Sequence, residues 1–242
     1  MEGNILIRKR VTIRDMIISV NHMIITLLML FSFVSLVAKD TSGEIALPKP
    51  AIKGGVSVEE AISQRRSVRV YAKEPLSLGE VSQLVWAAQG ITEPTKGKRS
   101  APSAGAKYPL TVYLVAGNVT GLTSGVYQYL PEKHSLQRLE SGDFRKELML
   151  RTSSQSWVGA APLSLIITAI YEKTTDKYTE RGKRYVHFEV GHAAENVLLQ
   201  CEALGLGSVT VGAFSDEGIQ KLLKLPKNEI PMYVLPIGKK LK

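Results

Sequence analysis

Cysteine is nearly absent from this chain of 242 residues, because Cys201 is the only one. A single cysteine excludes a disulfide within the chain, and its place in the apolar run NVLLQCEALG predicts a buried side chain without a redox role. Repeats, low-complexity segments, zinc-finger spacing and RNA-binding signatures are also missing. These absences argue against a nucleic-acid-binding module.

Acidic residues are also in deficit, with 22 Asp and Glu against 31 Lys and Arg and a net charge of +9. Such an excess favours an anionic partner, which could be a nucleic acid, a membrane surface or the phosphate of a small ligand. The chain is otherwise ordinary, with 44% hydrophobic and 22% charged residues. We therefore expect one globular domain with a sizeable core.

The N-terminal part differs in composition from the rest. Residues 16–38 are mostly apolar and follow four basic residues, although Asn21 and His22 interrupt the run. This pattern predicts a signal peptide or membrane anchor over residues 1–38, a linker over 39–55 and an exported domain over 56–242. The alternative is a buried helix of the globular fold, which would leave the protein in the cytoplasm.

Helices and strands alternate beyond residue 56 without a strict βαβ rhythm. Ser57 with Glu60 and Ser77 with Glu80 have the spacing of capping boxes, and the second helix is expected to end at Gly90. Further helices are expected at 144–150, 187–207 and 215–225, a hairpin at 125–139, and strands at 110–117, 162–171, 208–214 and 232–238. The order predicts an α+β domain with a mixed sheet.

The stretch ISQRRSVRVYA concentrates positive charge at a helix end. Arg65, Arg66 and Arg69 surround Ser67 and offer several planar donors and a hydroxyl, which together suit a phosphate group. The alternative is a charge cap of the helix C-terminus, although one basic residue would already complement the helix dipole. Both interpretations remain open on spacing alone.

Three other stretches are ambiguous without context. The small residues of APSAGAKYP could let the backbone approach a flat ligand, or could form an ordinary loop. GLGSVTVG follows a helix and opens a strand, which is the reverse of a dinucleotide-binding loop. Lys239 and Lys240 follow the last strand and could be a solvated tail.

The order RRSVR, APSAGAKYPL, RYVHFEVGHAAENVLLQCEALGLGSVTVGAF and PIGKK resembles the nitroreductase superfamily, in particular its SagB-type dehydrogenase branch. The resemblance runs from about Val58 to Lys240. It implies an α+β flavin fold and a homodimer with FMN in two interface sites. By position, the resemblance implies that the FMN phosphate and ribityl chain are bound by Arg65, Arg66, Ser67 and Arg69, and that Gly238 and Lys239 close on the phosphate. It implies that Pro102, Ser103 and Ala104 contact the flavin ring of the partner subunit and that Gln155 binds the pyrimidine edge of the ring. Backbone N–H groups near flavin N5 would come from Thr210, Val211, Gly212 and Ala213.

The chain departs from the family pattern at several positions. Gly212 stands where many nitroreductases have an acidic residue, and PSAGAKYP lacks the amide side chains of their loop. Arg184 precedes Tyr185 where azoline-oxidising members have lysine, and arginine is a poor general base. Azoline oxidation is therefore not expected, and Tyr185 is the one candidate catalytic proton donor unless it only packs at the dimer surface.

The resemblance implies hydride transfer through flavin N5, either for NAD(P)H-linked reduction of nitro or quinone acceptors or for oxidation of a small or peptide substrate. No metal is expected, because Glu189, His192 and Glu195 are not spaced for one site. Two rivals remain: a flavin-fold binding protein without redox turnover, and a basic membrane-surface module.

Overall fold

The computed structural model describes residues 43–241. The chain divides into Met1–Ser42 and Gly43–Lys242, and only the second unit is described here. The predicted signal peptide or anchor, together with residues 39–42 of the predicted linker, lies outside the described residues. Within residues 43–241, no helix combines the length and apolar character needed to cross a bilayer.

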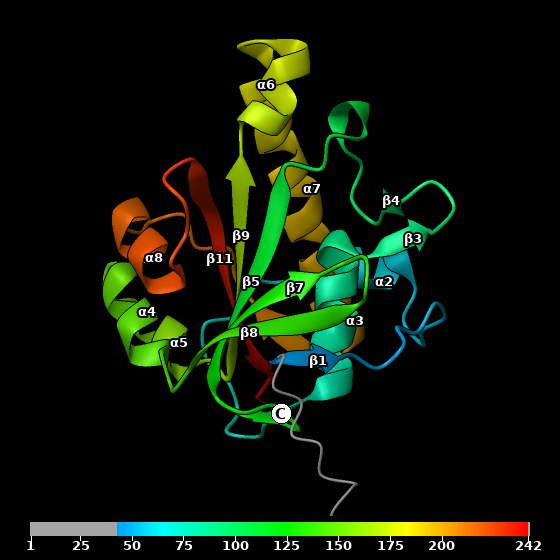
Figure 1. The fold of residues 1–242 in the computed structure, drawn as a ribbon. Helices are drawn as coiled ribbons and strands as arrows, with labels where there is room; N and C mark the ends of the chain where they lie inside the picture. The colour runs from blue at the N-terminus through cyan, green and yellow to red at the C-terminus, as the bar shows by residue number, and fades with distance from the viewer. Residues whose placement is uncertain (1–42, 242) are drawn as a thin grey trace, which may run out of the picture. The chain divides into compact units, whose positions relative to one another are not determined.

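A seven-stranded sheet forms the centre of the domain, in the order β1-β8-β7-β5-β9-β11-β10 (Figure 1). The strands are β1 (Glu44–Ala46), β2 (Leu76–Ser77), β3 (Ile91–Glu93), β4 (Lys98–Arg99), β5 (Leu110–Ala116), β6 (Val119–Thr120), β7 (Gly125–Leu130), β8 (Ser135–Ser141), β9 (Leu163–Ile170), β10 (Leu206–Ser208) and β11 (Glu229–Lys239). The helices are α2 (Val58–Gln64), α3 (Leu78–Gln89), α4 (Arg145–Arg151), α5 (Ser156–Ala160), α6 (Glu172–Tyr178), α7 (Arg181–Ala203) and α8 (Asp216–Leu223), with a short 3₁₀ helix η1 (Ala104–Ala106).

The α+β class expected from the sequence is confirmed. Neighbouring strands of the large sheet pair antiparallel. Parallel pairing occurs outside these ladders, between β2 and β6 and in the isolated bridge between Ser67 and Ser208. The mixed character of the β-structure therefore comes from short pairings at its border.

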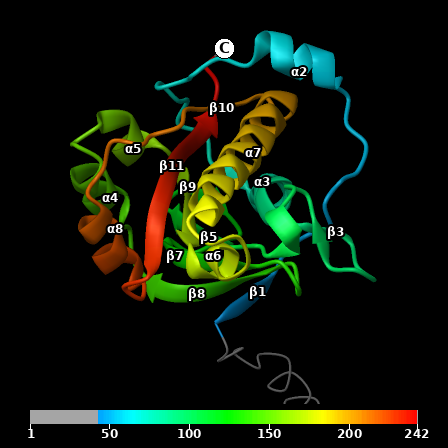
Figure 2. The same ribbon diagram turned by 90° about the horizontal axis from the view of Figure 1, so that it is seen from above.

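Helices cover both faces of the sheet. Figures 1 and 2 show α3, α6 and α7 on one side and α4, α5 and α8 on the other. Alternate residues of β5 follow this division, because Val112 and Leu114 belong to the core with α3 and α7, whereas Tyr113 and Val115 belong to the core with α4 and α8. Two separate cores explain why the central strands are apolar along their whole length.

Both predicted capping boxes are confirmed. Ser57 and Ser77 accept the N–H of Glu60 and Glu80, and each glutamate side chain binds the serine backbone in return. Each box satisfies two backbone donors that the first turn of a helix would leave free.

Two element boundaries from the sequence are wrong. The predicted helix 187–207 begins earlier, at Arg181, and ends at Ala203. The predicted strand 208–214 is not continuous: β10 occupies Leu206–Ser208, and Val211 then forms only an isolated bridge to Val234. Strand propensity there was right for single residues, but the regular ladder with β11 is interrupted between Ser208 and Val211.

Part of the predicted linker contacts the domain. β1 pairs with β8, and the Ala51 N–H donates to Gln83 Oε1 of α3 at 2.8 Å. His134 fixes the same stretch, because its Nε2 lies 3.0 Å from the Pro48 carbonyl and 2.8 Å from Ser82 Oγ. Burial lowers the pKa of His134, which favours the neutral ring.

Candidate functional site

The arginine-rich stretch, residues 65–72, lies along the edge of the large sheet and is called the arginine segment below. The Val68 N–H donates to the Ser208 carbonyl of β10 at 2.9 Å, and the Ala72 N–H donates to the Lys239 carbonyl of β11 at 3.0 Å. These two bonds fix both ends of the stretch that contains Arg69. The segment therefore extends the sheet beyond β10 as an irregular border.

Two glycines make room for the arginine segment. Gly207 of β10 and Gly238 of β11 are cross-strand partners, and both are buried. A Cβ on Gly207 would lie 2.5 Å from Val68 Cγ1, and one on Gly238 would lie 2.7 Å from Tyr71 Cβ. Both distances are shorter than any normal contact, so the segment can lie this close only over this glycine pair.

Tyr71 locks the segment onto the sheet. Its hydroxyl lies 3.0 Å from the Val68 carbonyl and 3.1 Å from the Pro236 carbonyl of β11. Burial strongly raises the pKa of Tyr71, which keeps the hydroxyl protonated as a donor. The side chain thus joins the segment to the strand beneath it.

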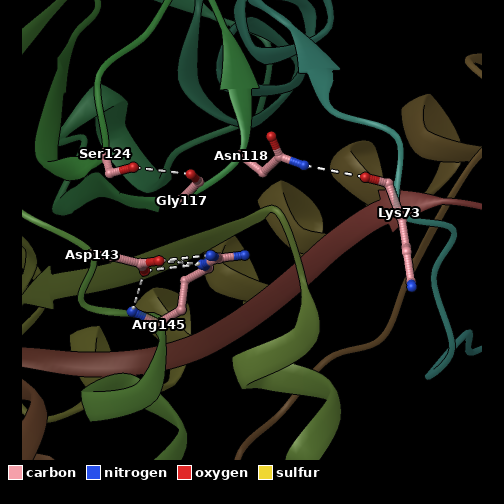
Figure 3. Close-up of polar contacts among 6 residues, drawn as sticks. All are labelled: Lys73, Gly117, Asn118, Ser124, Asp143 and Arg145. Carbon is pink, nitrogen blue, oxygen red and sulfur yellow. Dashed lines mark hydrogen bonds and ion pairs between the residues drawn. The ribbon is translucent and has the colours of Figure 1, made fainter.

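The chain after the arginine segment is also held in place (Figure 3). Asn118 Nδ2 donates to the Lys73 carbonyl at 3.2 Å, and the Leu76 N–H donates to the Asn118 carbonyl at 3.2 Å. Nearby, Arg145 forms an ion pair with Asp143 and covers Gly117, where a Cβ would lie 1.9 Å from Arg145 Nε. This loop cluster anchors the exit of the segment and contributes no site residue itself.

The three arginines differ in what they bind. Arg65 Nε lies 3.7 Å from Glu195 Oε1 of α7, a loose ion pair. Arg66 Nη1 donates to the carbonyls of Ser63 and Arg65, and the Arg69 guanidinium lies 5.5 Å from the centroid of the Trp157 ring. Among residues 43–241, no carboxylate forms an ion pair with Arg66 or Arg69. Most of their N–H groups are therefore free to bind an anion.

Two buried donors near these arginines also lack a partner within the described part of the chain. They are Ser208 Oγ, on the residue that bridges Ser67, and Trp157 Nε1, on the ring that Arg69 covers. Buried polar atoms are normally hydrogen-bonded, so each of these two donors has unused hydrogen-bonding capacity next to the arginine segment.

The structure brings Gln155 and the 210–213 stretch together. Gln155 Nε2 donates to the Ala213 carbonyl at 3.2 Å, and Gln155 stands at the start of α5, two residues before Trp157. The Val211 N–H is engaged by the Val234 carbonyl at 2.8 Å, so Val211 cannot offer it to a ligand. Thr210, Gly212 and Ala213 are exposed, so their backbone N–H groups can still bind a ligand.

Gly238 and Lys239 have contacts of their own. Gly238 lies beneath Tyr71, and the Lys239 ammonium forms an ion pair with Glu80 of α3. Lys240 pairs with Glu202 of α7. The suggestion that these lysines form a solvated tail is therefore wrong, and Lys239 presents no free ammonium to the arginine segment.

The Pro102–Ala104 loop lies against α7 and α6, and no contact within residues 43–241 joins it to the arginine segment. Ser103 Oγ accepts the Tyr108 N–H at 2.8 Å. A Cβ on Gly105 would lie 2.7 Å from the Tyr178 hydroxyl of α6, so this loop needs glycine there. One chain thus presents two separated parts of the predicted site.

Tyr185 is half-buried on the first half of α7. It lies beside Tyr178 of α6, whose hydroxyl lies close to Gly105 in the loop that follows Pro102. The two rings meet edge to face with centroids 5.2 Å apart, and the Arg181 guanidinium lies 6.0 Å from the Tyr185 ring. Arg184 is exposed. The arrangement leaves the Tyr185 hydroxyl without a hydrogen-bond partner among the described residues.

Glu189 is the residue that sequence analysis undervalued, since it was considered only as a metal ligand. It is 2% exposed, although it is a carboxylate on a helix. Burial raises the pKa of Glu189 to about 7, opposed by the nearby Ser103 hydroxyl and by the charge of Arg99. The signal was present in the sequence: Glu189 falls on the apolar stripe of α7 with Val186, Val190 and Ala193. Over residues 43–241, no His, Cys, Asp and Glu cluster suits a metal.

A cavity of about 770 Å³ lies between residues 49–58, α2, α3 and α7. Trp86, Leu199 and Gln200 line it, and none of the predicted site residues does. The hollow therefore does not mark the site, whose parts lie at the sheet edge and on the α7 surface.

Comparison with known proteins shows which sequences this chain resembles. The chain is 45% identical over 186 residues to the nitroreductase-named protein MJ1384 of Methanocaldococcus jannaschii, covering 77% of this chain and 92% of that protein. It is 27% identical over 172 residues to the microcin B17-processing protein McbC of Escherichia coli, covering 69% and 63%. It is 25% identical over 197 residues to an FMN reductase [NAD(P)H] of Bacillus subtilis, covering 75% and 65%.

The fold has solved counterparts as well. A nitroreductase-titled crystal structure from Ralstonia eutropha superposes with a TM-score of 0.73 and 29% identity, covering 85% of this chain and 93% of that one. The family model of the nitroreductases matches residues 62–239, which contain the arginine segment, the Pro102–Ala104 loop, α7 and the glycine pair. With most of its length matched in sequence and fold, this chain belongs to the nitroreductase family.

Proposed function

We propose that this protein is an FMN-dependent oxidoreductase whose arginine segment holds the FMN phosphate. The observation that carries the proposal is the set of donors at the sheet edge: Arg66 and Arg69 without carboxylate partners, beside the unpartnered Ser208 hydroxyl. A relative is named an FMN reductase that uses NAD(P)H, which supports the same cofactor.

The residues fit this cofactor. A phosphate dianion needs several donors in one place, and the segment supplies guanidiniums, the Ser67 hydroxyl and buried donors that otherwise pay a desolvation penalty. Gln155 and the exposed backbone of Thr210, Gly212 and Ala213 lie at the same side and offer donors to the edge of a flavin ring. When bound, FMN supplies two-electron chemistry through N5 of its ring.

The second half of the site comes from another copy of the chain in this proposal. Pro102, Ser103 and Ala104 lie away from the arginines of their own chain, so a homodimer is needed to bring them to the flavin. Apolar side chains are available to form the interface: Val58 and Ile62 of α2 and Phe188 of α7 are 65%, 59% and 55% exposed.

Tyr185 is the candidate proton donor of the reaction. It lies on α7 next to Tyr178, which contacts the Pro102–Ala104 loop at Gly105. A phenol there could donate a proton to an acceptor that receives hydride from the cofactor. Nitro and quinone compounds are the acceptor class that the family indicates.

A second candidate function is oxidation of a small or peptide substrate, as in the SagB-type branch. The similarity to the microcin B17-processing protein favours it. Arg184 beside Tyr185 argues against azoline oxidation, because a guanidinium does not accept a proton near neutral pH. A binding protein without turnover is the weaker alternative, since free arginines at the sheet edge are suited to the cofactor.

We expect NADH or NADPH to bleach the visible absorption of the FMN-loaded protein under anaerobic conditions, and menadione or nitrofurazone to restore it. Residues 1–38 would export the domain if they act as predicted, and a different electron donor would then be required. Reduction by dithionite but by neither nicotinamide would contradict the NAD(P)H-linked activity and favour that donor.

Tyr185→Phe should slow reoxidation by the quinone without changing FMN affinity.

A further inference from the structure

A second, smaller pocket lies between the end of α3, β4, the paired strands β5 and β7, and α6. None of the residues assigned to the FMN site lines it, so it is separate from the arginine segment. Its volume of about 170 Å³ equals that of roughly five water molecules at about 30 Å³ each, which leaves room for a ligand of about five non-hydrogen atoms. Its polar lining residues are Gln89, Arg99, Gln128, Glu132 and Lys173, together with the hydroxyl-bearing Tyr108, Thr111 and Tyr129.

Gln89 brings an unused donor to this pocket. The side chain is 1% exposed, and its Oε1 accepts a hydrogen bond from Arg99 Nη1 at 3.1 Å. Because a guanidinium only donates, this bond fixes the amide with its oxygen toward Arg99. Gln89 Nε2 is then buried without a hydrogen-bond partner among the described residues, although buried donors are normally satisfied.

Arg99 is held in the pocket wall from two sides. Its side chain is 14% exposed, and the guanidinium lies 4.8 Å from the centroid of the Tyr108 ring. Nη1 donates to Gln89, and Nη2 donates to Glu132 Oε1 at 3.0 Å. A guanidinium has five N–H donors, so these two bonds leave donors for a further acceptor.

The carboxylate that neutralises Arg99 is easy to displace. The Glu132 side chain is 66% exposed, in the turn between β7 and β8. Such a solvent-exposed partner contributes little to stability, because water competes for it and the side chain loses freedom when it pairs. A carboxylate that enters the pocket can therefore take the place of Glu132 at Arg99.

Lys173 of α6 adds a second positive charge to the pocket. It is exposed, and within residues 43–241 no carboxylate forms an ion pair with it. When Glu132 moves away, Arg99 and Lys173 leave the pocket with an excess of positive charge.

We propose that this pocket is a binding site for a small carboxylate, which displaces Glu132 from Arg99. Arg99 and Lys173 supply the charge, and the Gln89 amide supplies the unused donor. A carboxylate suits this set, because hydrogen bonds between ionised groups are about twice as strong as those between neutral groups. The proposal does not depend on the binding of FMN.

The experiment is an NMR titration of the full-length protein with sodium propionate at constant ionic strength. Propionate has five non-hydrogen atoms, and the amide signals of Tyr108, Leu110 and Gln128 report on the pocket walls. We expect these signals to shift saturably, with a dissociation constant of about 1–10 mM, as is reasonable for so small a ligand. Propionamide has the same shape without the charge and should bind at least about 10-fold more weakly.

Two exposed substitutions test the displacement without threatening the fold. Glu132→Gln removes the competing carboxylate and should tighten propionate binding about 2- to 5-fold, whereas Lys173→Ala should weaken it about 3-fold. Glu59→Gln is the matched control, because Glu59 is exposed on α2, lies outside the pocket and forms no ion pair in the described part of the chain. It should leave the affinity unchanged.

Gln89→Glu has the largest expected effect. The substitution keeps the shape of the side chain but places a permanent carboxylate against Arg99, and it should weaken propionate binding about 10-fold or more. Circular dichroism establishes whether this variant folds. If it does not, Glu132→Gln and Lys173→Ala decide the question.

The absence of saturable shifts up to about 100 mM propionate would overturn the proposal, as would equal affinity for propionamide. Equal tightening by Glu59→Gln and Glu132→Gln would also overturn it, because net charge and not displacement at Arg99 would then attract the carboxylate. Failure of the protein to bind FMN would refute the proposed function and leave the outcome of this titration untouched.

Discussion

A variant with Arg65→Ala and Arg69→Ala is expected to bind FMN about 100-fold more weakly than the wild-type protein. Each charged hydrogen bond to a phosphate contributes about 1.5–3 kcal/mol, and about 1.4 kcal/mol changes affinity tenfold. The fold should survive, because Arg69 forms no ion pair in the described part and the Arg65–Glu195 pair is loose and exposed. Flavin fluorescence quenching measures the affinity, and chemical denaturation measures the free energy of unfolding.

The matched control removes two positive charges elsewhere. Lys146 and Lys227 are exposed, form no ion pair among the described residues and lie outside the arginine segment, so Lys146→Ala with Lys227→Ala should change FMN affinity by less than about 3-fold. Equal losses in both double variants would mean that net charge, and not a phosphate site, attracts FMN. Unchanged affinity in the arginine variant would remove the phosphate assignment.

Gly238→Ala is expected to lower FMN affinity about 10-fold or more, although Gly238 need not touch the cofactor. The added methyl group would lie 2.7 Å from Tyr71 Cβ, so Tyr71 must move off the sheet and take the arginine segment with it. Overpacking of this kind costs about 1–3 kcal/mol of the free energy of unfolding. Fluorescence titration and denaturation of the same preparation measure the two effects together.

Gly79→Ala is the matched control for this substitution. Gly79 lies in the first turn of α3, where the nearest atom to an added Cβ is Ser77 Oγ at 3.9 Å. It should bind FMN like the wild-type protein. If Gly238→Ala also binds FMN normally, the glycine pair does not position the arginine segment.

The sequence was sufficient to propose candidate pieces of the site but not to predict their contacts. The arginines were recognised because their donors suit a phosphate, and the order of the motifs indicated the family. The glycine pair could not be predicted, because Gly207 and Gly238 meet only through the pairing of β10 with β11. The ion pair between Lys239 and Glu80 could not be predicted either, because the two residues are 159 positions apart in the chain and meet only in the folded domain.

Local propensity succeeded where contacts are local. The capping boxes at Ser57 and Ser77 were predicted correctly because each joins residues three positions apart. Propensity failed at residues 208–214, where β-branched side chains suggested a strand. The Val211 and Val209 side chains do pack in the core with α4 and α8, but the regular strand ends at Ser208 and only Val211 pairs with β11 beyond it. These valines are buried without forming a regular strand, and the apolar sequence pattern does not distinguish a buried loop from a buried strand.

The most direct test of the central claim is a titration of cofactor-free wild-type protein with FMN, followed by chromatographic identification of the flavin retained. We expect saturation at one FMN per chain, a yellow protein after gel filtration and release of intact FMN on denaturation. Riboflavin, which lacks the phosphate, should bind at least about 100-fold more weakly. A protein that stays colourless with excess FMN, or that binds riboflavin as tightly as FMN, would contradict the account.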